Sequence, residues 1–351
     1  MAGKARGQFV STVKANLPLC REHYRLVLGV VEFPPTEPGQ FVQVSCRDVR
    51  EVERLERELE WATTEPLQLT ADTLLTPGAM LRRPFSLAGR RDVGGGGVEL
   101  DIIHRVVGIG TDWLSRLSPG DEVGIVGPLG NQFVLPPEGA TAVLVGGGVG
   151  IPPMLYLAEK LAGRPAVAFA GALTGDLLPF TIRADVSPDG ANPTPAIEEF
   201  ARHGISSVIT TDDGSYGFRG FVTQALEQYL DQSGFGIGVS GFGDNRTNPS
   251  PTRHPRPDTR DPKPDTPHPI AIYTCGPEPM MKRVADIAAA RNIDCQIAVE
   301  RAMACGMGTC QSCCIRVKKP DPQQPPLVGR DWCYRLACTD GPVFHGADLL
   351  W

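Results

Sequence analysis

The sequence predicts a chain of three parts: an antiparallel β-barrel, a parallel-sheet α/β domain and a small cysteine-rich domain at the C-terminus. Three observations lead to this fold class. Short alternating apolar segments fill residues 7–46 and 81–135, strand–turn–helix patterns begin near Thr141, and six of the ten cysteines lie beyond residue 300. Short, regularly spaced strands are typical of barrels, and strands alternating with helices are typical of parallel sheets.

Composition excludes several classes of function. The chain of 351 residues is 41% hydrophobic and 21% charged, and its net charge of −6 provides no general attraction to nucleic acid. It contains no run of about 18 apolar residues, so we expect no membrane span. The basic N-terminus lacks a following apolar segment, which argues against a signal peptide and predicts a cytoplasmic protein. In that compartment clustered cysteines bind metal or do redox chemistry more often than they form disulfides.

The barrel is expected over residues 1–138. Segments such as QFVQVSC, RPFSLAG and VELDIIHRV have the length and alternation of strands. Residues 47–79 interrupt them with a densely charged stretch, in which apolar residues fall at near-helical spacing over 49–61. This spacing predicts a solvated amphipathic helix inserted into the barrel.

The α/β domain is expected over residues 139–298. TAVLVGGGVGIPPMLYLAEKLAG has the pattern of a buried strand, a glycine turn and a helix, and AIYTCGPEPMMKRVADIAAARN repeats it. Such a turn can present backbone N–H groups to a pyrophosphate, although a plain strand–helix connection uses glycine as well. The second strand ends without an acidic residue, and GALTGDLLPF after it has no Arg or Lys for a 2′-phosphate, which favours NAD over NADP. A stretch at about 241–269, with eight prolines from Pro249 to Pro269, predicts a disordered insertion.

The cysteine-rich domain is expected over residues 299–351. Cys305, Cys310 and Cys313 have the C-x4-C-x2-C spacing of plant-type [2Fe–2S] clusters, with Cys338 as the preferred fourth ligand and Cys333 as its competitor. Zinc is the alternative, but four-cysteine zinc sites generally use two C-x2-C pairs and this passage has one; unligated thiols are the third possibility. The remaining cysteines are interpreted as packed or core thiols: Cys20, Cys46, Cys295 and Cys314.

In this order the three parts resemble the ferredoxin–NADP⁺ reductase superfamily, a flavin barrel followed by a nicotinamide domain. With the cysteine-rich domain added, the chain is most similar to the family of electron-transfer subunits of NAD-dependent (class B) dihydroorotate dehydrogenases. The resemblance spans nearly the whole chain apart from the insertions. It is carried by LRRPFSLA, GIGTDWLSRLSPGDEVGIVGPLGNQF, LVGGGVGIPPM, TTDDGSYGFRGFVT, CGPEPMM, ERAMACGMGTCQSC and CTDGPVF.

The resemblance implies three cofactors: FAD, a [2Fe–2S] cluster and NAD. It implies that Arg83 pairs with an FAD phosphate, that Phe85 lies against the flavin and that Ser86 hydrogen-bonds its ring. Cys275 is implied to face the nicotinamide as the catalytic position. The other implied cofactor-binding residues are Pro84, His104, Arg105, Gly110, Thr111, Gly148, Gly150, Pro153 and Gly276, although a histidine such as His104 is also common as a plain barrel residue.

The implied activity is a relay in pyrimidine biosynthesis. A partner subunit oxidises dihydroorotate on its FMN, and this chain passes the electrons through the cluster and FAD to NAD⁺, in a hetero-oligomer with two copies of each chain. Two alternatives stay open at this stage. One is an NADH-dependent reductase of the same superfamily that feeds an oxygenase or hydrogenase, and the other is a zinc-stabilised binding module without enzyme activity.

Overall fold

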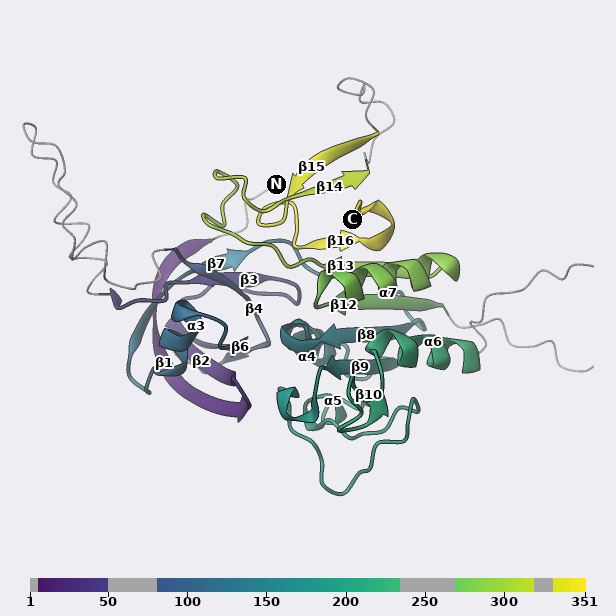
Figure 1. Ribbon diagram of the computed structural model, residues 1–351. Coiled ribbons are helices and arrows are strands. Elements are labelled where there is room, and N and C mark those ends of the chain that lie inside the picture. Colours follow the sequence, from purple (N-terminus) through teal and green to yellow (C-terminus); the bar gives the residue numbers. More distant parts are fainter. Residues whose placement is uncertain (1–5, 50–80, 234–268, 319–330) are drawn as a thin grey trace, which may run out of the picture.

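The computed structural model of the protein describes residues 6–49, 81–233, 269–318 and 331–351 (Figure 1). Within these ranges the chain forms two seven-stranded sheets and a two-stranded hairpin. The predicted amphipathic helix at 49–61 and the proline-rich stretch at about 241–269 lie outside the described residues except for their end residues. No helix in the described ranges is both long and apolar enough to cross a membrane.

The N-terminal sheet is antiparallel, with the strand order β4-β3-β7-β1-β2-β6-β5. It curves into a half-barrel on the left of Figure 1. Alternate residues of its strands, such as Leu26, Leu28 and Val30, point into one apolar core, which confirms the predicted antiparallel architecture. The elements are β1 (Gly7–Cys20), β2 (His23–Val31), β3 (Phe41–Val44), β4 (Arg83–Ser86), β5 (Gly89–Asp92), β6 (Gly97–Arg105), α3 (Ile109–Ser115) and β7 (Glu122–Leu129).

The second sheet has the order β11-β10-β9-β8-β12-β13-β16, and it is parallel except at the β16 edge. Helices α4 and α5 pack on one face, and α6 and α7 pack on the other. Burial on both faces explains the continuous apolar runs of its central strands. The elements are β8 (Thr141–Gly147), α4 (Ile151–Lys160), β9 (Ala166–Ala172), α5 (Glu198–Ala201), β10 (Ser206–Thr211), β11 (Phe218–Arg219), α6 (Val222–Gln232), β12 (Ile270–Cys275), α7 (Glu278–Ala290), β13 (Asp294–Ala298) and β16 (Val343–His345), with short 3₁₀ turns at Gly148–Gly150, Gly175–Leu177 and Gly346–Asp348.

The order of the parallel strands determines where a ligand can bind. The chain runs outward from β8 through β9 to β10, and it then returns to place β12 on the other side of β8. In open α/β sheets such a reversal opens a crevice at the carboxyl ends of the two strands that flank it. The switch point here lies between β8 and β12, where both glycine-containing turns follow their strands.

The C-terminal part joins both larger parts. The hairpin of β14 (Cys314–Lys318) and β15 (Trp332–Leu336) stands above the second sheet in Figure 1, and β16 then returns to pair with β13. Ile315 and Val317 share an apolar core with Ile297 of the α/β domain. Asn131, after β7, donates hydrogen bonds to the carbonyl oxygens of Asp340 (3.1 Å) and Val343 (2.8 Å). The cysteine-rich part is therefore held against both sheets.

Candidate redox site

A cleft of about 1570 Å³ lies between the half-barrel and the carboxyl edge of the parallel sheet. Its walls come from β4, the start of α3, the β8–α4 turn, the ends of β9, β10 and β12, and residues 298–303. Pockets for a single small ligand are typically about 300–1,000 Å³. The volume is therefore sufficient for two ligands, as a flavin and a nicotinamide dinucleotide would require.

The barrel wall of the cleft contains the predicted flavin motif. Arg83, Pro84, Phe85 and Ser86 are consecutive on the edge strand β4, and all four line the cleft. Among the described residues the Arg83 guanidinium donates a hydrogen bond to the carbonyl oxygen of Leu81 at 3.0 Å and forms no ion pair.

The other arginines of the cleft are already neutralised by carboxylates. A charge without a counter-ion in a cleft favours an anionic ligand, so Arg83 fits the implied role of phosphate partner. The ion pairs of the other three are Arg105–Glu22 (2.8 Å), Arg283–Glu227 (2.8 Å) and Arg301–Glu278 (2.6 Å).

His104 is buried in the same wall, and its ring nitrogens accept and donate no hydrogen bond in the described structure. Its imidazole stacks on Tyr24, with ring centroids 5.8 Å apart, and it packs edge to face with Phe85, with ring centroids 6.0 Å apart. Burial, and then His23, lowers the pKa of His104 to about 4, so the ring is neutral at pH 7. Buried polar atoms without partners are costly. The two nitrogens are buried beneath the cleft wall, so in this rotamer they do not reach a ligand in the cleft.

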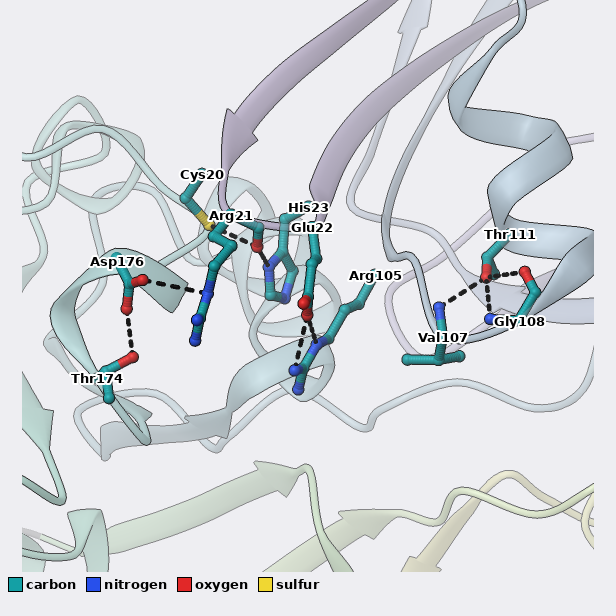
Figure 2. A network of polar contacts seen from close by, with 10 residues as sticks. All are labelled: Cys20, Arg21, Glu22, His23, Arg105, Val107, Gly108, Thr111, Thr174 and Asp176. Carbon is teal, nitrogen blue, oxygen red and sulfur yellow. Dashed lines mark hydrogen bonds and ion pairs between the residues drawn. The ribbon is translucent and has the colours of Figure 1, made fainter.

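A polar network flanks the cleft where β1, β2 and α3 meet (Figure 2). The Thr111 hydroxyl accepts hydrogen bonds from the backbone N–H groups of Val107 (2.9 Å) and Gly108 (3.2 Å), so it holds the turn in shape. Gly110 and Thr111 both line the cleft, a position that fits the pyrophosphate loop implied by the resemblance. Arg105 lines it as well, although its guanidinium is held by Glu22.

The same network connects the two sheets. Arg21, in the turn between β1 and β2, forms an ion pair with Asp176 at 3.1 Å, and its backbone N–H also donates to the Asp176 carbonyl at 3.1 Å (Figure 2). Asp176 lies in the 3₁₀ turn after β9. This contact fixes the spacing of the two walls beside the cleft.

The glycines of the two turns at the switch point are required for different reasons. Gly148 has φ +52°, and a Cβ added to it would meet nothing within 4 Å. It therefore opens the turn toward the cleft. At Gly150 a Cβ would lie 2.1 Å from the Cys275 carbonyl oxygen, and at Gly276 it would lie 3.0 Å from the Gly147 oxygen, so these two glycines let the turns approach one another. Gly150 lines the cleft, whereas Gly276 and the buried Pro153 do not; Pro152 lines it instead.

Cys275 ends β12 at the mouth of the sheet and lines the cleft as predicted. Its side chain is only 7% exposed. Burial raises the pKa of Cys275 to about 12, with a smaller contribution from Glu300. At neutral pH the residue is a neutral thiol, and it can pack against a ligand but cannot act as a thiolate nucleophile.

The cysteine loop comprises residues 305–313 together with Cys338. The Cys305 sulfur accepts hydrogen bonds from the backbone N–H groups of Met307 and Cys310, both at 3.4 Å, and the Cys310 thiol lies 3.2 Å from the Ser312 hydroxyl. The loop contains left-handed residues at Gly306 and Gly308, with φ +70° and +88°. Backbone N–H groups directed at sulfur are the environment that a cluster of iron and sulfide requires.

Cys338 completes this set from the end of the β15 turn. Burial, and then Cys313, raises the pKa of Cys338 to about 12, with a smaller contribution in the same direction from Cys305. Cys333 instead lies within β15, opposite Val317. The geometry therefore supports Cys338 as fourth ligand. In the described ranges no three His, Cys, Asp or Glu side chains converge on a single-ion site, so the four-thiol set is inferred from these pairwise contacts.

The remaining cysteines separate into two groups. Cys46 and Cys295 are buried core residues, as expected. Cys314 is exposed on β14 and Cys20 is only half-buried at the end of β1, so the interpretations of Cys314 as a packed thiol and of Cys20 as a core residue are wrong. In both cases a strand end carries the side chain out of the core, which the local pattern does not reveal.

Several cleft residues were not predicted. The far end of the cleft is formed by the residues after β9 and β10 and by the first turns of α6. The passage TTDDGSYGFRGFVT contains half of them, but its alternation identifies a strand and not the face to which the end of that strand points. The additional residues at this end are Asp212, Phe221, Thr223, Gln224, Glu227 and Arg283.

A half-barrel with a flavin-type motif, a parallel sheet with a glycine turn at its switch point and a four-thiol loop together define a class. The chain is a flavin- and nicotinamide-dependent oxidoreductase with an iron–sulfur domain. Residues 300–350 match the model of the iron–sulfur cluster binding domain of dihydroorotate dehydrogenase B. The chain is also 30% identical, over 97% of both lengths, to the dihydroorotate dehydrogenase B (NAD(+)) electron transfer subunit of Geobacillus thermodenitrificans.

This chain therefore belongs to the family of dihydroorotate dehydrogenase B electron transfer subunits. The corresponding subunit of Caldanaerobacter subterraneus subsp. tengcongensis is 29% identical over 77% of this chain and 81% of its own. Membership confirms the predicted class of activity, electron transfer with FAD, a [2Fe–2S] cluster and NAD as cofactors.

Solved structures confirm the fold. A NADH-dependent reduced ferredoxin–NADP oxidoreductase covers all of this chain and 92% of its own length, with a TM-score of 0.59 and 23% identity. An Amycolatopsis cytochrome P450 reductase covers 84% of this chain and 68% of its own, with a TM-score of 0.51 and 22% identity. At these identities the likeness extends to the architecture only.

Proposed function

We propose that this chain transfers electrons from a dihydroorotate dehydrogenase catalytic subunit to NAD⁺. The observation that carries the proposal is the position of the cysteine loop. Ala302 and Met303 line the cleft, and the same segment runs directly into Cys305. A chain that holds a cluster loop and a dinucleotide-sized cleft side by side has the parts that such a transfer needs.

The three cofactors exchange electrons in different ways. A bound flavin exchanges single electrons with an iron–sulfur cluster and a hydride with nicotinamide, which allows one chain to connect the two. The protein supplies the positions. Cys305, Cys310, Cys313 and Cys338 hold the cluster. These four thiols come from a loop whose backbone N–H groups already point at sulfur.

The half-barrel binds the FAD. Arg83 pairs with a phosphate, because it is the cleft arginine without a carboxylate partner among the described residues. Phe85 packs against the ring system, and Ser86 and the neutral His104 offer it hydrogen bonds. Both His104 nitrogens are buried and lack other partners among the described residues, so a hydrogen bond to the flavin requires the ring to turn toward the cleft.

The α/β domain binds the nicotinamide dinucleotide at the switch point. Gly148 leaves the turn open to the cleft, while Gly150 and Gly276 allow the two turns to lie against each other. Cys275 lies at the mouth of β12 as a neutral, polarisable side chain. It excludes water and packs against the ring, and no proton transfer is required of it.

We assign the domains as residues 1–138 for FAD, 139–298 for NAD and 299–351 for the cluster. The apolar core of the half-barrel supports the first boundary. Contacts cross the last boundary, because β16 of the cluster domain pairs with β13 of the NAD domain and the two domains share an apolar core. The cluster domain is therefore anchored, which keeps its thiols at a constant position relative to the cleft.

The partner docks on the exposed side of the cysteine loop. Cys313 and Cys338 are buried, whereas Cys310 is exposed and Met307 is 55% exposed. An apolar side chain beside an exposed ligand is suited to contact with another protein. We propose that the partner carries FMN, that the complex contains two copies of each chain and that it is cytoplasmic.

The test is reconstitution. Anaerobically purified chain is analysed for iron, acid-labile sulfide and FAD, and it is then mixed with a dihydroorotate dehydrogenase catalytic subunit of the class B type. We expect dihydroorotate-dependent reduction of NAD⁺ in the mixture and in neither component alone. A preparation with no iron, sulfide or flavin contradicts the proposal. So does a fully loaded chain that reduces NAD⁺ with dihydroorotate in the absence of the catalytic subunit.

A further inference from the structure

Ser312 lies in the cysteine loop between Cys310 and Cys313 and is not itself a ligand. Its hydroxyl oxygen accepts a hydrogen bond from the backbone N–H of Ala304 at 3.3 Å, and the same oxygen lies 3.2 Å from the Cys310 sulfur. The side chain therefore joins the segment that enters the loop to the second ligand thiol. Because the Ala304 N–H holds the oxygen in place, its contact with the sulfur does not depend on a freely rotating side chain.

Ligation determines the direction of the hydrogen bond between Ser312 and Cys310. A serine hydroxyl has one hydrogen to donate and two lone pairs that accept. The Ala304 N–H uses one lone pair of Ser312 and leaves its hydrogen free. A cysteine that binds iron is a thiolate, which accepts hydrogen bonds and has none to donate. When Cys310 is a ligand, its contact with Ser312 is therefore an O–H···S hydrogen bond.

The donor at Cys310 differs in kind from the donors at Cys305. The Cys305 sulfur accepts from two backbone N–H groups, which the shape of the loop provides whatever side chains it carries. In the described ranges Cys310 is the one ligand thiol with a side-chain hydroxyl at hydrogen-bonding distance. Ser312 is therefore a position at which the choice of side chain, and not the path of the backbone, adds a donor to a ligand sulfur.

Hydrogen bonds to sulfur are among the factors that set the reduction potential of an iron–sulfur cluster. A donor stabilises the reduced form more than the oxidised form, because the reduced form is more negative. We propose that Ser312 raises the reduction potential of the [2Fe–2S] cluster by donating a hydrogen bond to Cys310. The inference rests on the proposed function, since it takes the four thiols to hold that cluster. Ser312 is thus a positioning residue that acts through a ligand, and it makes the cluster easier for the partner subunit to reduce.

The test is the reduction potential of the cluster in the full chain loaded with FAD and cluster, measured by anaerobic titration with EPR detection. Ser312→Ala should lower the potential by about 59 mV, which is a tenfold change in the equilibrium constant for one electron. Ser312→Thr keeps the hydroxyl and should stay close to the native value. Ser312→Gly also lacks the hydroxyl and should match Ser312→Ala, so the result does not depend on one variant.

Thr309→Val is the matched control, because it removes an exposed hydroxyl of the same loop that forms no hydrogen bond with the described residues. It should leave the potential unchanged. Pulsed ENDOR after exchange into D₂O provides a second measurement, in which Ser312→Ala should lack an exchangeable proton coupling that the native chain and Ser312→Thr show.

Two results overturn the inference. One is a native potential in cluster-loaded Ser312→Ala and Ser312→Gly, and the other is an equal fall in Thr309→Val. A native chain that holds no cluster instead contradicts the proposed function, so the two failures are distinguishable.

Discussion

In the cysteine loop three of the four thiols come from nine consecutive residues, 305–313, whereas the walls of the cleft draw on segments from His23 to Pro342. The loop is shaped by local backbone geometry and by N–H groups that point at sulfur. The cleft is shaped by the packing of two sheets and by the Arg21–Asp176 contact that joins them. Substitutions should therefore act all-or-none in the loop and in a graded, cofactor-specific way in the cleft.

Cys310 of the cysteine loop and Cys275 of the cleft have opposite acidity, whereas the buried Cys338 of the loop resembles Cys275. Hydrogen bonds from the Ser312 side chain and backbone, and from Cys305, lower the pKa of Cys310 to about 6. Burial raises the pKa of Cys275 to about 12. Metal ligation requires the thiolate, and a residue packed against a ligand does not. The contrast shows that exposure and nearby donors, more than residue type, decide which cysteine is prepared for which task.

The largest effect is expected for Cys310→Ser, which tests whether the loop behaves as a unit. Loss of one thiolate of four should abolish the cluster and the partner-dependent reduction of NAD⁺, while FAD content and NADH-dependent dye reduction stay largely intact. Absorbance, EPR and iron analysis check the first point, and a diaphorase assay checks the second. Cys314→Ser is the matched control, an exposed thiol four residues away that should retain the cluster. Loss of dye reduction with FAD retained in Cys310→Ser would contradict the separation of the two regions.

The next largest effect concerns the protonation of His104 and the pH dependence of stability that it causes. Since the folded-state pKa of His104 is about 4 and the ordinary value is 6.5, the unfolded chain binds more protons between these values. The stabilisation by the neutral ring is complete above pH 6.5 and is lost as the pH falls to 4, by up to about 3 kcal/mol. His104→Gln should remove this part of the pH dependence. Urea unfolding of the flavin-free protein at pH 7.5 and 4.5 measures it, and equal slopes in both proteins would show that the burial of His104 is not the cause.

Arg83→Ala tests whether an unpaired charge matters more than a paired one in the same cleft. We expect weaker FAD binding by about 2 kcal/mol, roughly 30-fold in Kd, because a charge-assisted contact to phosphate is lost. Arg105→Ala, which removes a guanidinium already paired with Glu22, should cost less. Flavin fluorescence during titration of the apoprotein gives both constants. Equal losses in the two variants would contradict the argument from pairing.

The smallest effect is expected for Cys275→Ala. A neutral thiol that only packs against the nicotinamide should be replaceable with a loss of about fivefold or less in kcat for NADH-dependent dye reduction. The buried sulfur also contributes to the core, and its removal should lower the free energy of unfolding by about 1 kcal/mol. Stopped-flow reduction of the flavin by NADH and urea denaturation measure the two quantities. A loss of 100-fold or more would show that Cys275 takes part in the chemical step.

Much of the architecture follows from local patterns. Alternation over strands such as β2 and β6 predicts the antiparallel sheet, and the strand–turn–helix pattern at Thr141 predicts the parallel sheet. The spacing of Cys305, Cys310 and Cys313 predicts the cluster loop. Local spacing is sufficient in these cases because neighbouring residues interact through the same short piece of backbone.

Other features depend on contacts between distant parts of the chain. Gly150 and Gly276 belong to the predicted glycine turns, yet their requirement for glycine comes from the approach of β8 to β12. Pro153 was expected at the dinucleotide and lies buried in α4. Cys314 was expected to be packed and is exposed on a hairpin. In each case the deciding neighbour is far away in the chain, so spacing alone cannot identify it.

The amino-acid sequence by itself determined that this protein has a barrel, a parallel sheet and a cluster loop, because periodicity and cysteine spacing are written in consecutive residues. Only the tertiary structure decided that the Arg83 charge lacks a carboxylate partner among the described residues, that His104 is buried beside the cleft without hydrogen bonds to them, and that Asp212 and not Asp213 lines the cleft. The physical reason is that charge pairing and burial depend on which elements pack together. That packing is fixed by the order of strands in two sheets, and neighbours in a sheet need not be neighbours in the chain.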